Sequence, residues 1–287
     1  MTYGQLLKEA AERLEAAGVD DPQWDAQELL AHAGGPDRTH FPLQKEEEVP
    51  QGVLFMFDAY VGCRANRIPL QHILGECWFM GLPFKVDETV LIPRQDTEVL
   101  VEKALELSAG HPEWRVLDLC TGSGAIGISL AKLGGFERVY AADLSAEALA
   151  LARENAVMNR VGRRIVFACG DLLAARPEKG EPLETMSFDL ICCNPPYIPS
   201  GEIETLEPEV KDHDPLMALD GGADGLSFYR RLARELRPVL APEGRLLLEI
   251  GCEQGQAVSG LLAEAGFREV RVLQDLAGLD RVVTARR

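Results

Sequence analysis

The sequence lacks any apolar run approaching the roughly 20 residues that a membrane-spanning helix requires. Its first residues contain no basic stretch leading into an apolar one, so they do not have the pattern of a secretory signal peptide. There is also no internal repeat and no low-complexity segment. We therefore expect a globular cytoplasmic protein that does not bind membranes.

The seven cysteines include no C-x-x-C pair, the spacing typical of metal sites and redox pairs. Several lie in apolar runs, among them Cys169, Cys192 and Cys193, and we expect reduced core residues and no metal site.

Basic residues are also scarce. Lys and Arg number 29 against 46 Asp and Glu, a net charge of −17. Because bare nucleic acid is bound largely by neutralising its phosphates, a basic protein or a cationic small molecule is the better partner, although acidity can also serve solubility alone.

The first part of the chain has the periodicity of helices. Apolar residues recur at helical spacing over residues 5–17. Asp21-Pro22 offers an N-cap and a first-turn proline for a second helix, and a third is predicted over residues 51–64. No side chain here suggests catalysis, so we expect residues 1–72 to form a helical bundle that docks the substrate.

The character of the sequence changes at residues 73–90, where aromatic residues alternate with glycine and proline, which predicts a β-hairpin linker. Strand and helix patterns then alternate over residues 91–287, as in a doubly wound, largely parallel α/β sheet. The predicted strands cover residues 115–119, 138–142, 165–168, 188–193, 245–250, 269–273 and 281–285. The last two are joined by a stretch too short for a crossover helix, so they should be antiparallel.

A glycine-rich turn follows the first predicted strand of this domain. Glycines in Cys120-Thr121-Gly122-Ser123-Gly124 let the backbone approach a ligand closely. Asp143 ends the second strand, where an acid can accept hydrogen bonds from both hydroxyls of a ribose. After the third strand, Asp171 can accept from an adenine amino group while Leu172 packs on the ring. Each acid alone could be a turn or cap residue, but their order predicts a site for an adenosyl ligand.

The fourth strand ends in Asn194-Pro195-Pro196-Tyr197. Two prolines cannot continue a central strand, so the chain must leave the sheet at Asn194, at the edge where open α/β sheets bind ligands. The Asn194 carboxamide and the Pro195 carbonyl can each accept one proton of an –NH2 group, with the Tyr197 ring beside them. Alone, the tetrapeptide could be a surface turn. Its position after the adenosyl-site pattern favours a role in binding an amino group.

Together these motifs resemble those of the HemK/PrmC family, the protein-(glutamine) methyltransferases that modify peptide chain release factors, over essentially the whole chain. The resemblance also rests on Arg67-Ile68-Pro69-Leu70-Gln71-His72-Ile73-Leu74-Gly75, on Leu91-Ile92-Pro93-Arg94-Gln95-Asp96-Thr97-Glu98 and on Ala218-Leu219-Asp220-Gly221-Gly222-Ala223-Asp224-Gly225. The last two segments are the most specific. Two positions depart from the family pattern: Gln95 replaces a second proline, and Cys120 replaces a common glycine.

The resemblance implies a Rossmann-like class I methyltransferase domain with an antiparallel terminal strand. It implies S-adenosylmethionine as methyl donor, S-adenosylhomocysteine as product, and the glutamine of the release factor's Gly-Gly-Gln motif as acceptor. The residues implied to bind the methyl donor are Cys120, Thr121, Gly122, Ser123, Gly124, Asp143, Asp171, Leu172 and Asn194. Those implied to hold the glutamine are Asn194, Pro195, Pro196 and Tyr197, with Asn194, Pro195 and Tyr197 catalytic. We expect a monomer that makes no direct contact with nucleic acid.

Other functions remain open at this point. A DNA or RNA adenine amino-methyltransferase can use the same tetrapeptide, but the net charge and the absence of a basic cluster count against it. A non-enzymatic adaptor that binds release factor has no need for both Asp143 and the tetrapeptide. A nicotinamide oxidoreductase would need an acid or base for hydride transfer, and none stands out.

The motifs leave more than one role open for the polar residues Arg94 and Glu98. Arg94 either braces or contacts the active site or forms a surface salt bridge, and the role of Glu98 is equally open. Asp220 and Asp224 are interpreted as turn residues.

Overall fold

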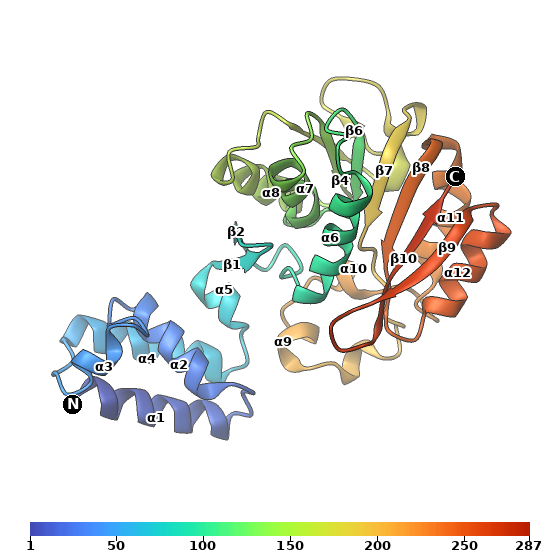
Figure 1. The fold of residues 1–287 in the computed structure, drawn as a ribbon. Helices are drawn as coiled ribbons and strands as arrows, with labels where there is room; N and C mark the ends of the chain where they lie inside the picture. Colours follow the sequence, from blue (N-terminus) through green and yellow to red (C-terminus); the bar gives the residue numbers. More distant parts are fainter. The chain divides into compact units, whose positions relative to one another are not determined.

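The computed structural model describes all 287 residues, and the chain divides into two compact units. The first comprises Met1–Glu76 and Glu207–His213, and the second comprises Cys77–Leu206 and Asp214–Arg287 (Figure 1). A short segment of the C-terminal half therefore belongs to the N-terminal unit. None of the helices combines the length and the apolar character that a membrane span requires.

The first unit is helical. Its helices are α1 (Tyr3–Ala16), α2 (Pro22–His32), α3 (Phe41–Gln44), α4 (Gln51–Ala65), α5 (Leu70–Leu74) and, from the later segment, α9 (Pro208–Lys211). A capping box begins α1, since the Thr2 hydroxyl accepts from the Gln5 amide and the Gln5 side chain accepts from the Thr2 amide. Asp21 caps α2 as predicted, accepting from the Trp24 amide at 3.4 Å.

An apolar core and one buried ionic network hold this unit together. Leu14, Leu29 and Phe57 are among the side chains buried between α1, α2 and α4. At the edge of this core, Arg64 Nε donates to Asp25 Oδ2 at 2.6 Å and Arg64 Nη1 donates to Glu209 Oε1 at 2.8 Å. Burial alone would raise the Glu209 pKa, but hydrogen bonds from arginine outweigh it and lower the pKa to about 2. The network thereby fixes the Glu207–His213 segment within the unit.

An eight-stranded sheet forms the centre of the second unit, in the order β6-β5-β4-β3-β7-β8-β10-β9. The strands are β3 (Val116–Leu119), β4 (Val139–Asp143), β5 (Ile165–Cys169), β6 (Arg176–Pro177), β7 (Phe188–Cys193), β8 (Leu240–Glu249), β9 (Arg268–Gln274) and β10 (Asp280–Arg286). Strands β5, β4, β3, β7 and β8 are parallel, whereas β10 is antiparallel to β8 and β9. The predicted α/β sheet with an antiparallel terminal strand is therefore confirmed.

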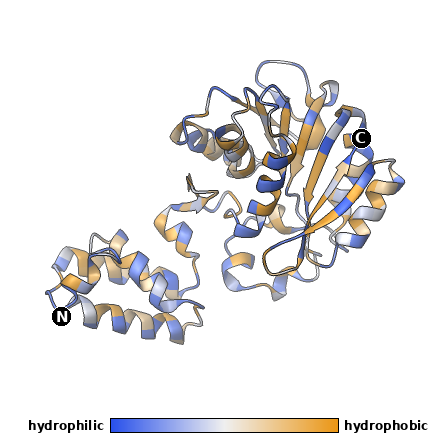
Figure 2. Cartoon of the chain, in the orientation of Figure 1, coloured by the Kyte–Doolittle hydropathy of each residue, from blue (hydrophilic) through white to orange (hydrophobic).

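Helices cover both faces of this sheet. On one face lie α6 (Glu98–Leu107), α7 (Ala125–Leu133) and α8 (Ala146–Met158), and on the other lie α11 (Ser227–Val239) and α12 (Gly255–Glu264). Successive strand residues alternate between the two cores, as Cys192 and Cys193 do. The central strands are accordingly mostly hydrophobic along their length (Figure 2).

The prediction that Cys169 is a core residue is wrong. Cys169 is the last residue of β5 and is exposed. Cys169 pairs with the exposed Arg176 of the two-residue edge strand β6, so this end of β5 lies next to the open edge of the sheet and not in its core. Cys192 and Cys193 are buried and unpaired, as predicted.

A separate two-stranded sheet consists of β1 (Glu76–Phe79) and β2 (Leu82–Lys85). The two residues between the strands, Met80 and Gly81, have φ of +52° and +69°, as a type I′ hairpin turn requires. Phe79 and Phe84 are buried in edge-to-face contact, with ring centroids 6.1 Å apart. Trp78 instead faces solvent, at 67% exposure.

Candidate functional site

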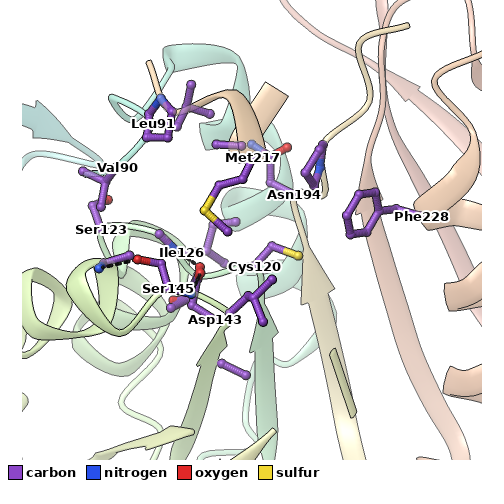
Figure 3. Close-up of a pocket in the computed structure, with 18 of the residues that line it drawn as sticks. Val90, Leu91, Cys120, Ser123, Ile126, Asp143, Ser145, Asn194, Met217 and Phe228 are labelled. Carbon is purple, nitrogen blue, oxygen red and sulfur yellow. Dashed lines mark hydrogen bonds between the residues drawn. The ribbon is translucent and has the colours of Figure 1, made fainter. Parts of the chain in front are cut away.

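A cavity of 690 Å³ lies at the carboxyl edge of the parallel strands of the second unit. It is lined by the turn after β3, the ends of β4 and β5, the tetrapeptide after β7, and residues of the segments 89–97 and 215–231. Figure 3 shows Cys120, Asp143, Met217 and Asn194, from four separate parts of the chain, around this cavity. Its volume suits a small-molecule ligand, for which pockets of about 300–1,000 Å³ are usual.

The glycine-rich turn between β3 and α7 has an unusual backbone. Cys120, Gly122 and Gly124 all have positive φ, at +56°, +52° and +84°. A Cβ at Gly124 would lie 2.7 Å from Ile128 Cδ1, whereas one at Gly122 would meet nothing within 4 Å. Gly124 therefore permits the packing of α7, and open space remains above Gly122 for a ligand. The departure at Cys120 places a side chain in a conformation that costs about 1–2 kcal/mol for non-glycine residues.

Asp118 fixes this turn from below. It is fully buried in β3, and its Oδ2 accepts from Thr121 Oγ1 at 2.5 Å and from the Gly127 amide at 2.8 Å. Burial raises its pKa to about 7. Asp118 does not line the cavity, and its supporting role could be suspected from the sequence only because an acid interrupts an apolar strand.

Asp143 lies where β4 meets the cavity. Its Oδ2 accepts from the Gly122 amide at 2.8 Å, and its Oδ1 accepts from the Ser145 amide at 2.9 Å. Burial raises the pKa of this carboxyl. Because a carboxylate offers about four lone-pair sites, capacity for a ligand remains beside these bonds and the further backbone hydrogen bonding from Leu144. Asp143 therefore both stabilises the turn and lines the cavity.

Asp171 and Leu172 also line the cavity, after β5. Both oxygens of Asp171 accept from the Arg231 guanidinium, at 3.0 Å each. Arg231 projects from α11 into the same wall, and no motif in the sequence pointed to it. An Asp171 held in this way keeps its remaining lone pairs for a ligand.

Only two of the four tetrapeptide residues line the cavity. Asn194 and Pro196 line the cavity, whereas Pro195 and Tyr197 do not. Tyr197 is half-buried, burial raises its pKa to about 12, and its carbonyl accepts from Gln254 Nε2 at 2.9 Å. The tetrapeptide is therefore anchored from behind.

The glycine-rich segment 218–225 packs against the tetrapeptide. A Cβ at Gly221 would lie 2.8 Å from the Tyr197 carbonyl carbon, and one at Gly225 would overlap the Tyr197 oxygen. These glycines are thus needed for close approach of two backbones. Asp220 Oδ1 accepts from Ser200 Oγ at 2.7 Å and from the Gly222 amide at 2.8 Å, which agrees with the interpretation as a turn residue.

Behind Asn194 lies a polar cluster that the sequence did not reveal. Asn194 Nδ2 is 3.5 Å from Thr97 Oγ1, and Glu249, the last residue of β8, is only 1% exposed. Burial raises the Glu249 pKa to about 7, against hydrogen bonds from Thr97 and Asn194 that lower it. The sequence signal was a single acid at the end of an apolar strand.

The structure gives Arg94 and Glu98 specific partners that the sequence did not predict. Arg94 lines the cavity, and its Nη2 donates to Asp214 Oδ2 at 2.8 Å, where the Asp214 side chain is fully buried. Glu98 Oε1 accepts from the Met80 amide at 2.5 Å and so ties the β1–β2 hairpin to α6.

No group of three His, Cys, Asp or Glu side chains could hold a metal ion.

Comparisons with known proteins bear on the family of this chain. The PrmC N-terminal domain family matches residues 5–75, and the Methyltransferase small domain family matches residues 95–206. The release factor glutamine methyltransferase of Cereibacter sphaeroides is 43% identical over 286 residues, which is 100% of this chain and 99% of that protein. The chain belongs to the release factor glutamine methyltransferase family. The resemblance drawn from the motifs is thereby confirmed.

Further members of the family, and a solved structure, extend the comparison. The release factor glutamine methyltransferase of Moorella thermoacetica is 42% identical over 288 residues, 100% of this chain and 99% of that protein. Among solved structures, the hMettl16 catalytic domain in complex with MAT2A 3'UTR hairpin 6 has a TM-score of 0.58 at 17% identity, over 79% of this chain and 81% of that one. That likeness concerns the fold alone and agrees with a class I methyltransferase sheet in this family member.

Proposed function

We propose that this chain transfers a methyl group from S-adenosylmethionine to the side-chain amide nitrogen of the glutamine in the Gly-Gly-Gln motif of peptide chain release factors. The observation that carries the proposal is the position of Asn194, which lines one cavity together with Gly122 and Asp143. Full-length similarity to release factor glutamine methyltransferases supports the same function.

The residues around the cavity suit this methyl donor. Open space above Gly122 admits a ligand to the turn, and the Asp143 carboxylate keeps lone-pair capacity that can accept from ribose hydroxyls. Asp171 would accept from the adenine amino group while Arg231 holds its carboxylate, and Leu172 would pack on the ring. When bound, the methyl donor supplies a methyl group on a positively charged sulfur.

The acceptor is a weak nucleophile, because the lone pair of an amide nitrogen is delocalised into its carbonyl. Asn194 Oδ1 and the Pro195 carbonyl would each accept a hydrogen bond from one of the two N–H groups of the amide, and so orient the nitrogen. Such fixed acceptors stabilise the positive charge that develops on nitrogen as the sulfur–methyl bond breaks, S-adenosylhomocysteine leaves, and one N–H proton is lost to solvent. Alignment of two reactants can supply about 7–11 kcal/mol. Pro196 lines the wall beside them. Tyr197, which lies outside the cavity lining, would support the loop, and its ring would pack on the glutamine amide once the substrate is bound.

We further assign docking of the release factor to the helical residues 1–72, with residues 73–90 as the linker to the catalytic residues 91–287. The net charge of −17 suits a basic protein partner. We expect a monomer that acts in the cytoplasm, where translation terminates, without direct contact with nucleic acid.

One experiment tests the function directly. The purified protein is incubated with labelled S-adenosylmethionine and either intact release factor or a variant with alanine in place of the Gly-Gly-Gln glutamine, and the label is located by peptide mapping. We expect label on that glutamine and none on the variant. Single-stranded and duplex oligonucleotides serve as a further arm. Label on adenine and none on release factor would establish the rival nucleic-acid activity instead.

A further inference from the structure

Three polar side chains from distant parts of the sequence meet behind the cavity wall. Thr97 ends the short 3-10 turn Gln95–Thr97, Asn194 follows β7, and Glu249 ends β8. Since β7 and β8 are parallel neighbours with Cys193 opposite Leu248, the chain places Asn194 beside Glu249. Thr97 is 4% exposed and Glu249 1%, and of the three only Glu249 does not line the cavity.

Hydrogen bonding in this cluster determines which end of the Asn194 carboxamide faces the protein. Asn194 Nδ2 faces Thr97 Oγ1 at 3.5 Å, hydrogen bonding from Thr97 and Asn194 lowers the pKa of the adjacent Glu249 carboxyl, and Glu249 Oε2 is buried without another partner. Above a pH of about 7, where the buried Glu249 is ionised, its carboxylate only accepts hydrogen bonds, and the –NH2 of a carboxamide only donates them. Turning the Asn194 carboxamide over would set its oxygen against the carboxylate and leave buried groups unpaired, which costs free energy. The –NH2 end is therefore held by the protein, which leaves Oδ1 for the cavity.

We propose that Glu249, acting with Thr97, is a positioning residue that fixes the orientation of the Asn194 carboxamide, so that Oδ1 is presented to the acceptor amide. This inference rests on the proposed function for its catalytic consequence. It also gives a role to Thr97 in the segment Leu91–Glu98, which neither the methyl donor nor the acceptor explains. Arg281, which pairs with Asp96 at 3.2 Å, favours the ionised form of Glu249, whereas Asp96 opposes it.

Two variants at position 249 separate orientation from packing. Glu249→Gln keeps a carbonyl oxygen that can accept from Asn194, whereas Glu249→Leu has similar size and no acceptor. We expect Glu249→Leu to lower kcat about 10²-fold, the loss typical of a misplaced reacting group, with little change in S-adenosylmethionine affinity or in KM for release factor. Glu249→Gln should restore most of the lost activity. Thr97→Val, which removes one hydroxyl, should act in the same direction as Glu249→Leu.

The matched control is Thr284→Val, which changes a buried hydroxyl on β10 of the same sheet, away from the cavity. It should leave kcat unchanged. A second control combines Glu249→Leu with Asn194→Ala. If Glu249 acts through Asn194, the double variant should be no slower than Asn194→Ala alone, because residues that act as a unit are not additive. Additive losses, or a wild-type kcat in Glu249→Leu, would overturn the inference.

A measurement that does not depend on turnover tests this inference separately from the proposed function. The side-chain –NH2 signals of Asn194 in a nitrogen-15 NMR spectrum are identified by their loss in Asn194→Ala. They should shift markedly in Glu249→Leu and little in Glu249→Gln and Thr284→Val. Unchanged signals in Glu249→Leu contradict the inference even if the enzyme is active. If the wild type fails to methylate release factor, the proposed function falls, and these signals alone decide the role of Glu249.

Discussion

The Asp143 carboxylate accepts a hydrogen bond from the Gly122 amide at 2.8 Å, and so joins the end of β4 to the turn that follows β3. The residue proposed to bind the ribose is thereby also the residue that holds the glycine-rich turn in place. Ligand contact and loop shape are coupled at this position, and variants must separate them.

Asp143→Ala should weaken S-adenosylmethionine binding about tenfold or more, since hydrogen bonds to a charged group contribute about 1.5–3 kcal/mol each. Asp143→Asn retains one carbonyl acceptor and should lose less. Isothermal titration calorimetry on both variants measures the difference, and circular dichroism establishes that they are folded. A folded Asp143→Ala with wild-type affinity would remove Asp143 from the site.

The backbone at Cys120 allows a test of strain in the same turn. Cys120→Gly removes a side chain from φ +56° and should relieve about 1 kcal/mol, which the greater freedom of glycine in the unfolded chain offsets in part. We therefore expect little net change in the free energy of unfolding and retained binding of the methyl donor. Cys120→Val, with a β-branched side chain, should be clearly destabilised in urea titrations. Equal stability of the two variants would show that the turn relaxes.

Several parts of this architecture could be predicted from the sequence because they depend on local patterns. The strand Phe188–Cys193 was predicted with its observed ends, since an apolar run stops at two prolines. The antiparallel final pair follows from the short connection before Arg281. Arg231 and Glu249 could not be found in this way, because their partners Asp171 and Asn194 lie more than 50 residues away and meet them only in the folded sheet.

Close packing of Gly225 on the tetrapeptide predicts a strong effect of one methyl group. Gly225 has φ +71°, and a Cβ there would overlap the Tyr197 carbonyl. Gly225→Ala should displace the tetrapeptide, lower kcat and destabilise the protein, by about 1–3 kcal/mol as overpacking usually does. The matched control is Gly201→Ala, where a Cβ meets nothing within 4 Å. If both variants have wild-type kcat and melting temperature, the segment 218–225 does not support the tetrapeptide.

Burial of Glu249 predicts a pH dependence of stability. Its pKa is about 7 in the folded protein, above the ordinary value of 4.5, so the folded state binds more protons than the unfolded state between these pH values. Stability from this group therefore falls as pH rises from 4.5 to 7, in total by on the order of 3 kcal/mol at 1.36 kcal/mol per pKa unit. Comparing wild type with Glu249→Gln isolates this contribution from other carboxyls.

The measurement is urea unfolding of both proteins at several pH values from 4.5 to 8. The stability of wild type relative to Glu249→Gln should decline over that range and level off above pH 7. A difference that stays constant would mean that Glu249 keeps an ordinary pKa in the folded protein.

Asn194 is the residue on which the proposed chemistry depends most. Asn194→Ala removes the acceptor that would orient the glutamine nitrogen, and loss of one preorganised polar contact of this kind lowers kcat by about 10²–10³-fold. Because the turn after β3 and Asp143 remain intact, binding of S-adenosylmethionine should survive. Single-turnover methyl transfer to intact release factor, with affinity for the methyl donor measured in parallel, checks both parts. The control is Ser200→Ala, which lies beyond the tetrapeptide and outside the cavity lining and should transfer at nearly the wild-type rate. Wild-type transfer by Asn194→Ala would mean that another group holds the nitrogen, and the assignment of the tetrapeptide as the acceptor site would then be wrong.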